Sequence, residues 1–363
     1  MESLSIIIPN YNYAPLLDRR LKSIVDQTVK PSEIIFLDDF SNDDSLNVAQ
    51  NLLSQCDIPW RIVKNDCNQG VFKQWLKGLE LARHNYIWIA EADDYCELNF
   101  LEKLFTAFDD DKVVLAYCQS RFVDQLGKEI DNYYNYISRY FDFSKWSQDY
   151  KENGVEEVRK YLCCTNTIPN ASAVLFNKSL IDLSKISQIA DYSNNGDWLF
   201  YILSLSSYPE NKICYLSEPL NYFVRHQSSV FGKEENPTRP ILEFLSIMLY
   251  MLEHFTIDPS AKHAMLKSLI GNLIYWPIDY DLNALVTKIM KFLPQDNFYR
   301  IYNQEMEQII ARFKNKLNIY ENRIKERDEY ILKLESSVEE YKNNNLIFRI
   351  KRKAKELLSA RWW

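Results

Sequence analysis

The sequence predicts an α/β protein whose central sheet is mostly parallel. Over residues 4–119, short β-branched runs alternate with stretches of helical periodicity, which is typical of parallel βαβ units. Polar clusters follow three of these runs, at Asn10–Asn12, Asp38-Asp39 and Glu91–Asp94. Because ligands bind beyond the carboxyl ends of the strands in such sheets, the three clusters predict a binding site at one sheet edge.

The predicted strands and helices follow one another along the chain. The strands are expected at Leu4–Ile8, Glu33–Leu37, Trp60–Lys64, Tyr86–Ala90, Val113–Cys118, Ala171–Phe176 and Ile213–Leu216. The helical patterns are Arg20–Gln27, a helix that starts at Ser41–Asp44, Val71–Arg83, Leu98–Phe108 and Asp197–Leu205. Each assignment depends on apolar residues that recur with a helical period or form a short continuous run.

Four segments are expected in the chain. A first domain spans residues 1–235, and residues 236–298 form a helical extension. Residues 299–345 contain six heptads in which ten of twelve a and d positions are apolar or aromatic, which predicts a coiled coil and a homo-oligomer. Residues 346–363 carry six basic side chains against one acid and end in Trp362-Trp363, a pattern typical of an amphipathic membrane anchor.

The composition argues against several classes of protein. The 363 residues include only 7 Gly, and neither G-x-G-x-x-G nor G-x-x-x-x-G-K occurs, which disfavours dinucleotide dehydrogenases and P-loop NTPases. A net charge of −7 gives no support for a nucleic-acid partner. Seven Cys without a C-x-x-C pair predict reduced thiols in a cytosol. We find no secretory signal pattern and no apolar stretch of 18 residues.

The polar clusters can carry chemistry. Glu91-Ala92-Asp93-Asp94 places three carboxylates in four residues, and hard oxygen ligands of this kind suit Mg²⁺ or Mn²⁺ bound to a diphosphate. Asp38-Asp39 can accept hydrogen bonds from a ribose or a base, and the turn at Pro9–Asn12 can present an aromatic face to a base. Each cluster also has a purely structural alternative. Glu91–Asp94 could be a solvated acidic loop, Asp38-Asp39 a helix cap near Ser41, and Pro9–Asn12 an ordinary turn.

Together these segments resemble the family 2 glycosyltransferases, which are inverting enzymes with the GT-A fold, a Rossmann-like α/β fold. The resemblance rests on Ser5–Asn12, Ile34–Ser41 and Ile87–Asp94 and covers roughly residues 4–230. It implies that the nucleotide is held by Pro9, Tyr11, Asn12, Asp38 and Asp39. The family's Asp-x-Asp motif falls on Glu91-Ala92-Asp93. This implies Asp93 as a metal ligand. Glu91 stands where the family has Asp and would bind the nucleotide by accepting bonds from ribose hydroxyls or from metal-bound water.

Two downstream segments extend the resemblance. Asn195-Gly196-Asp197-Trp198 resembles the segment that carries the catalytic base, which implies that Asp197 takes the proton of the acceptor hydroxyl. Asp191 is an alternative base, and a plain first-turn helix acid is the structural alternative for Asp197. Arg225-His226 resembles the basic segment that closes over the diphosphate. This implies that Arg225 binds phosphate and that His226 binds the metal or a phosphate. Lys73 is a candidate nucleotide contact or else a surface lysine.

The expected function is transfer of a sugar from a nucleotide sugar to a hydroxyl of a glycan acceptor, with inversion and with Mg²⁺ or Mn²⁺ as cofactor. UDP is the first expectation for the nucleotide and dTDP the second. A membrane-bound tail implies a lipid-linked acceptor of surface polysaccharide synthesis, O-antigen or capsule, and a cytoplasmic protein peripheral to the plasma membrane. The alternatives are an inactive coiled-coil scaffold and a sugar-nucleotide nucleotidyltransferase. Nucleotidyltransferases usually need a Gly-rich loop near the first strand. Pro9–Pro15 contains no Gly, which disfavours this second alternative.

Overall fold

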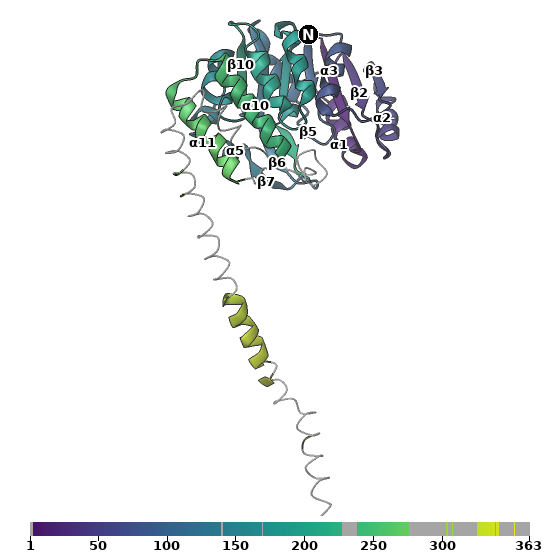
Figure 1. Cartoon of the computed structure of the whole chain (residues 1–363). Coiled ribbons are helices and arrows are strands. Elements are labelled where there is room, and N and C mark those ends of the chain that lie inside the picture. Colours follow the sequence, from purple (N-terminus) through teal and green to yellow (C-terminus); the bar gives the residue numbers. More distant parts are fainter. Residues whose placement is uncertain are drawn as a thin grey trace, which may run out of the picture. The chain divides into compact units, whose positions relative to one another are not determined.

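The computed structural model describes residues 3–138, 141–168, 170–226 and 238–275, together with 303, 307, 325–337, 339–340 and 352. The chain divides into two compact units, Met1–Ile301 and Tyr302–Trp363. In the first unit, helices flank a central sheet (Figure 1). In the second unit, residues 325–337 form a helix whose side chains are exposed.

The sheet has ten strands within the described residues and runs in the order β3-β2-β1-β4-β9-β6-β10-β5, with β7 beside β6 and β8 beside β10. The strands are β1 (Leu4–Asn10), β2 (Glu33–Asp38), β3 (Trp60–Lys64), β4 (Tyr86–Ile89), β5 (Tyr95–Cys96), β6 (Val113–Val123), β7 (Glu129–Asn132), β8 (Tyr150–Asn153), β9 (Val174–Asn177) and β10 (Lys212–Val224). Neighbours from β3 to β4 pair in parallel, as do β6 and β10. The α/β class with a largely parallel sheet is therefore confirmed, although β9 lies antiparallel between β4 and β6.

The helices are α1 (Ala14–Val25), α2 (Ser45–Leu53), α3 (Val71–Leu81), α4 (Phe100–Phe105), α5 (Tyr133–Ile137), α6 (Gly154–Glu157), α7 (Leu183–Ile186), α8 (Gly196–Leu205), α10 (Thr238–His254) and α11 (Pro259–Tyr275). The helical stretch predicted from Arg20 forms part of α1, which begins at Ala14. Pro15 occupies the first turn of this helix, where proline favours helix initiation. The predicted helix at Leu98–Phe108 is shorter than expected, since α4 gives way to a 3-10 turn at Thr106–Asp109.

Two apolar cores cover the two faces of the sheet. Within β2, Ile34 and Phe36 join the core on one face, together with Leu17 of α1. Ile35 and Leu37 join the core on the other face. Because both faces are buried, the strands read as continuous apolar runs rather than as alternating patterns.

Helices α10 and α11 lie in the segment predicted as a helical extension. Ile241 and Met248 of α10 and Met265 of α11 belong to the same core as helix α8. The described part of the extension therefore packs on the sheet domain, while the domain boundary itself stays a prediction.

The predicted coiled coil and tail lie largely outside the described residues. Ile331 and Leu334, which were assigned to a and d positions, are 42% and 46% exposed in the helix at 325–337. Only Arg352 of the tail is described. In the described part of the chain, no helix combines the length and apolar character that a bilayer span requires.

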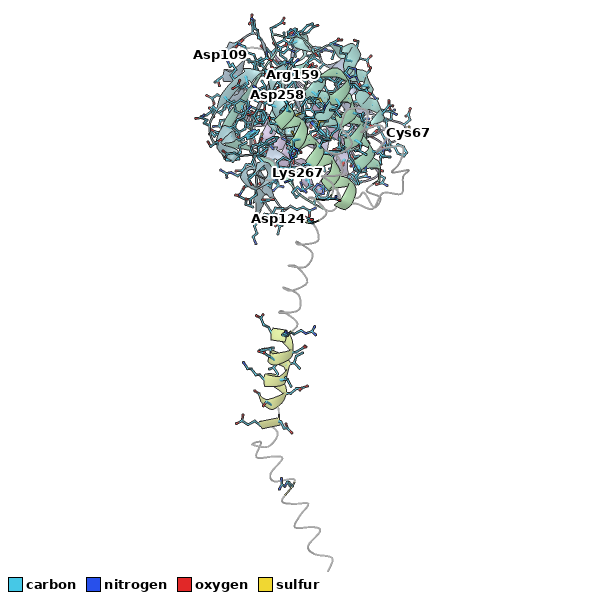
Figure 2. The ribbon with its side chains drawn as sticks, turned by 60° about the vertical axis from the view of Figure 1, so that its left-hand side comes forward. Cys67, Asp109, Asp124, Arg159, Asp258 and Lys267 are labelled. Atoms are coloured by element: carbon cyan, nitrogen blue, oxygen red, sulfur yellow. The ribbon has the colours of Figure 1, made fainter. Side chains whose placement is uncertain are left out.

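All seven cysteines lie in the described residues as free thiols. Cys67 is the exposed one (Figure 2). Cys163 and Cys164 are buried neighbours with their Sγ atoms 3.5 Å apart.

Candidate active site

The turns that follow β1 and β2 are tied together at the carboxyl edge of the sheet. Asn10 Nδ2 donates to Asp38 Oδ1 and to Ser41 Oγ, each at 3.1 Å. Asn12 N donates to Ser41 Oγ at 2.9 Å. Asn12 and Phe40 have φ values of 60° and 67°, a left-handed conformation that is uncommon for residues other than glycine. This conformation strains the backbone and persists only where the surrounding contacts enforce it. Residues strained in this way are found most often at functional sites.

Asp39 is occupied by contacts within the protein. Its carboxylate accepts bonds from Asn65 Nδ2 (2.8 Å), Gln69 N (2.9 Å), Gly70 N (2.8 Å) and Gln74 Nε2 (2.8 Å). These donors belong to α3 and to the loop before it, so Asp39 fixes the start of that helix. Its partners show a structural role that the sequence did not reveal.

The other residues predicted to hold the nucleotide lie near these turns in different environments. Tyr11 is 38% exposed, so its aromatic ring reaches the surface. Pro9 is buried within β1. Lys73 is exposed on α3, as expected for a surface lysine.

Glu91 begins the acidic segment after β4 and is held from three sides. Its Oε1 accepts a bond from Trp75 Nε1 at 2.8 Å, and its backbone carbonyl accepts one from Arg20 Nε at 2.8 Å. Its backbone N–H donates to Ser172 Oγ at 3.1 Å. Burial, followed by the charge of Asp93, raises the pKa of Glu91 to about 8. The side chain is therefore mostly protonated at neutral pH.

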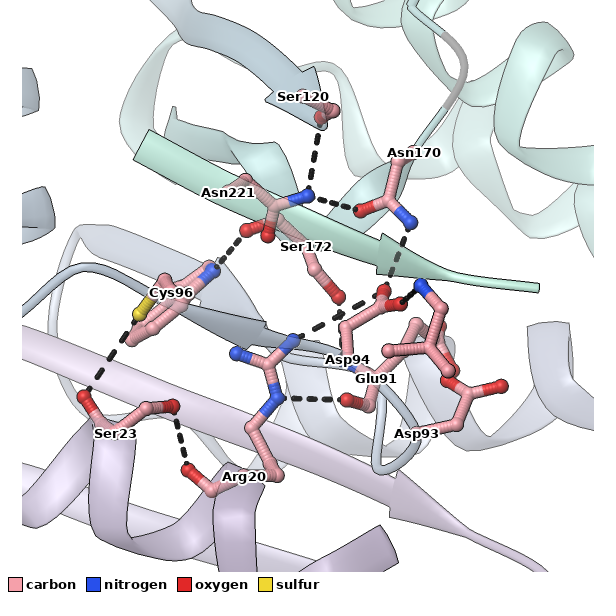
Figure 3. Close-up of polar contacts among 12 residues, drawn as sticks. Arg20, Ser23, Glu91, Asp93, Asp94, Cys96, Ser120, Asn170, Ser172 and Asn221 are labelled. Carbon is pink, nitrogen blue, oxygen red and sulfur yellow. Dashed lines mark hydrogen bonds and ion pairs between the residues drawn. The ribbon is translucent and has the colours of Figure 1, made fainter. Parts of the chain in front are cut away.

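Asp94 links the acidic segment to the end of β10 (Figure 3). Its Oδ1 accepts a bond from Val224 N at 2.9 Å, and its Oδ2 accepts one from Asn170 Nδ2 at 2.8 Å. The buried guanidinium of Arg20 places Nη2 4.0 Å from the same Oδ2. Asn221 of β10 donates to Asn170 Oδ1 at 3.1 Å, which extends the network into the strand. A buried network of this kind fixes the positions of its members.

The link through Asp94 brings His226 to Asp93. His226 follows Val224 by two residues, and its Nε2 lies 2.9 Å from Asp93 Oδ2 although the residues are 133 positions apart in the sequence. Within the described residues, no group of three or more His, Cys, Asp or Glu side chains could hold a metal. Mg²⁺ commonly takes one or two protein ligands and fills its remaining positions with water and substrate phosphate. Neighbouring ligands of an octahedral ion lie about 3 Å apart at the usual bond lengths. The Asp93–His226 pair therefore fits a divalent ion.

Arg225 lies beside this pair at the end of β10. Its side chain is exposed, and its guanidinium carbon lies 5.2 Å from the ring centre of Phe223. Its backbone N–H donates to Val123 O at 2.8 Å, which continues the pairing with β6. Arg225 therefore lies at the same edge of the sheet as the acidic segment.

Asp197 lies in the first turn of α8 with both carboxylate oxygens bonded. Oδ1 accepts a bond from Trp198 N at 2.7 Å, and Oδ2 accepts one from Asn166 Nδ2 at 3.0 Å. Asn166 is held in turn by Tyr136, whose hydroxyl donates to the Asn166 carbonyl at 2.6 Å. Burial raises the pKa of Asp197 to about 7. A pKa near neutrality suits a general base. The alternative base, Asp191, is exposed at the end of a 3-10 turn.

Several polar residues of the site carry no motif and were missed in the sequence. They are Arg20, Trp75, Asn166, Asn170 and Ser172. Arg20 alone offered a signal, because it lies on the apolar face of α1 with Leu17, Leu21 and Ile24, and all four are buried. A buried arginine needs a partner of opposite charge. An arginine on an apolar helix face is therefore a signal for an acidic group near that helix.

Comparison with known proteins finds a family match for part of this chain. The family model described as glycosyl transferase family 2 matches residues 5–168. The chain carries a family 2 glycosyltransferase domain. The matched range includes the turns after β1 and β2 and the acidic segment, whereas Asp197, Arg225 and His226 lie beyond it. The roles of these three residues follow from their positions and contacts alone.

The glycosyltransferase domain has relatives among characterised and uncharacterised proteins. An uncharacterized glycosyltransferase of Haemophilus influenzae is 23% identical over 339 residues, which is 87% of this chain and 98% of that protein. A GalNAc(5)-diNAcBac-PP-undecaprenol beta-1,3-glucosyltransferase of Campylobacter jejuni is 35% identical over 94 residues, 26% of this chain and 30% of that protein. Matches to two other relatives span 36% and 52% of those proteins.

Among solved structures, S. aureus TarS in complex with UDP-GlcNAc aligns with a TM-score of 0.60 at 14% identity, over 85% of this chain and 92% of that chain. At this identity the likeness shows the fold alone. The glycosyltransferase domain therefore has the GT-A-like architecture that the sequence predicted.

Proposed function

We propose that this chain is an inverting glycosyltransferase that moves a sugar from a UDP-sugar to a hydroxyl of a glycan acceptor, with dTDP-sugars as the second choice of donor. The observation that carries the proposal is the Asp93–His226 pair, 2.9 Å apart at the carboxyl edge of a family 2 domain. The UDP-GlcNAc named for TarS supports the choice of UDP.

The donor is held at the carboxyl edge of the sheet. The ring of Tyr11 faces the base. Asn12 and Asp38 hold the two turns in shape through the bonds described above, and Asp39 fixes the start of α3. Asp93 and His226 would hold Mg²⁺ or Mn²⁺, which when bound neutralises the diphosphate and stabilises it as a leaving group. The exposed guanidinium of Arg225 binds a phosphate oxygen, since it presents paired N–H donors.

Asp197 acts as the base. Its carboxylate accepts the proton of the acceptor hydroxyl while the oxygen forms its bond to the anomeric carbon. The bond from that carbon to the diphosphate oxygen breaks in the same displacement, so the configuration inverts and the nucleoside diphosphate leaves. Asn166 holds Asp197 through its bond to Oδ2, and each carboxylate oxygen retains a further lone pair for the proton.

We further propose a lipid-linked acceptor presented at an anionic membrane surface. The Campylobacter jejuni relative is named for an undecaprenol diphosphate acceptor, and the tail at 346–363 carries six basic residues with a terminal Trp pair. A coiled coil over 299–345 would join copies of the chain. The competing function is an inactive scaffold, which predicts no nucleotide binding.

Thermal shift measurements with UDP, dTDP, GDP and CMP, each with and without Mn²⁺, test the proposal. A ligand at 100 times its Kd stabilises the folded state by about 2.7 kcal/mol, which raises Tm by several degrees. We expect a Mn²⁺-dependent rise with UDP that Asp93→Ala removes. Asp18→Ala is the matched control, because Asp18 is an exposed acid on α1 paired with Lys22. No rise with any nucleotide would favour the scaffold.

A further inference from the structure

Helix α10 carries a buried carboxylate that is bonded to the loop before the proposed base. Glu243 is 8% exposed. Its Oε1 accepts bonds from Ser193 N at 2.7 Å and Ser193 Oγ at 2.9 Å. Its Oε2 accepts bonds from Asn194 N at 2.8 Å and Asn195 N at 2.9 Å. One side chain thus satisfies three consecutive backbone amides, and the last of them lies two residues before Asp197.

Two further contacts seat the same loop on α10. Asn195 Nδ2 donates to the backbone carbonyl of Pro240 at 2.8 Å. The ring of Trp198, which follows Asp197, lies 5.2 Å from the ring of Phe244. The residues on both sides of Asp197 are therefore held by α10, whereas the carboxylate itself is held by Asn166 from another part of the chain.

We infer that Glu243 is a positioning residue for the transfer step, which orients Asp197 by fixing the backbone from Ser193 to Asn195. The inference rests on the proposed function, because it takes Asp197 as the base. Buried amides that lose their acceptor carry a free-energy cost, so without Glu243 the loop would move to reach water. A displacement of about 1 Å at a reacting group can lower a rate about a hundredfold. Helix α10 is on this view part of the catalytic unit.

The substitution Glu243→Gln tests this role. The glutamine amide would place an N–H donor against the backbone N–H donors, so the bonds to one of the two oxygen positions are lost at nearly unchanged volume. The ion pair between Arg239 and Glu243 Oε1, 3.3 Å in length, is lost as well. Glu243→Asp keeps the charge but shortens the reach. The matched control is Glu253→Gln, since Glu253 is an exposed acid on the same helix. Asp197→Asn is measured beside them.

Each full-length variant is assayed for nucleotide release from a mixture of UDP-sugars and dTDP-sugars at saturation, and for the Kd of UDP. We expect Glu243→Gln to lower the rate about tenfold to a hundredfold and to leave the Kd of UDP within twofold. Glu243→Asp should recover part of the rate, and Glu253→Gln should match the wild type. Hydrogen exchange should quicken at residues 193–198 in Glu243→Gln and stay unchanged in β1 and β2.

Three results overturn the inference. A Glu243→Gln protein that keeps its rate within twofold, while Asp197→Asn loses turnover, leaves the base in place and removes the positioning role. A Glu243→Gln protein that loses UDP affinity and exchange protection throughout the sheet shows a general loss of stability instead. If Asp197→Asn keeps its turnover, the proposed base itself is refuted, and the positioning role is refuted with it.

Discussion

Replacing Asp197 by asparagine is expected to stabilise the protein at pH 8 while it removes turnover. Burial raises the pKa of Asp197 from 3.8 to about 7 in the folded protein. A group whose pKa rises on folding contributes stability at low pH, and that contribution is lost as the pH climbs from the unfolded pKa to the folded one. At about 1.36 kcal/mol per pH unit, the change corresponds to at most about 4 kcal/mol. The side chain is partly exposed, so screening by water reduces this to about 1–3 kcal/mol.

The assay is urea unfolding of the wild type and Asp197→Asn at pH 5 and at pH 8. Asparagine also weakens the bonds to Trp198 and Asn166, but that cost is the same at both pH values. The change with pH therefore isolates the charge. We expect the variant to gain about 1–3 kcal/mol relative to the wild type between pH 5 and pH 8. An equal difference at both pH values would refute the reasoning, because Asp197 would then ionise as readily in the folded chain as in the unfolded chain.

Three further predictions concern other parts of the chain. Asp94→Asn removes the counter-charge of the buried Arg20 and should lower the unfolding free energy in urea by about 3–5 kcal/mol; an unchanged value would contradict the role given to this pair. Phe40→Gly relieves a left-handed backbone and should raise the unfolding free energy by about 1 kcal/mol, and a lower value would mean that the ring packs against the protein. Deletion of residues 346–363 should abolish co-sedimentation with anionic vesicles and preserve nucleotide release, whereas unchanged sedimentation would remove the membrane proposal.

The strands could be predicted because they are buried on both faces, so that consecutive residues in each strand are apolar. Ile34 and Phe36 enter one core and Ile35 enters the other, so the run is apolar at every position. The direction of β9 could not be predicted in this way. Val174–Asn177 pairs antiparallel with both β4 and β6, and a short apolar run reads alike for either direction.

The site was predictable where function resides in a motif and not where it depends on remote contacts. The resemblance pointed to both Asp93 and His226 as metal ligands, and the chain brings them together; their role stays a prediction. Asp39 was expected to hold the nucleotide, but it also accepts bonds from the amides of Gln69 and Gly70. Every residue except proline has a backbone N–H, so the sequence does not indicate which of these groups a carboxylate will bind. Glu243 was missed for the same reason, because three of the five bonds to its carboxylate come from the backbone.

The position of β10 has a consequence for how the chain folds as it is synthesised. β10 pairs with β6, for example Ile213 with Leu115, and it delivers His226 to a partner made 133 residues earlier. At about 5–20 residues per second, the acidic segment leaves the ribosome on the order of ten seconds before its partner. During that interval the edge of β6 that β10 will cover has no partner, and such an edge invites pairing with other chains. Non-local pairing of this kind also folds slowly. The nascent chain therefore passes through a stage that needs protection from aggregation before it has any means of using a nucleotide sugar.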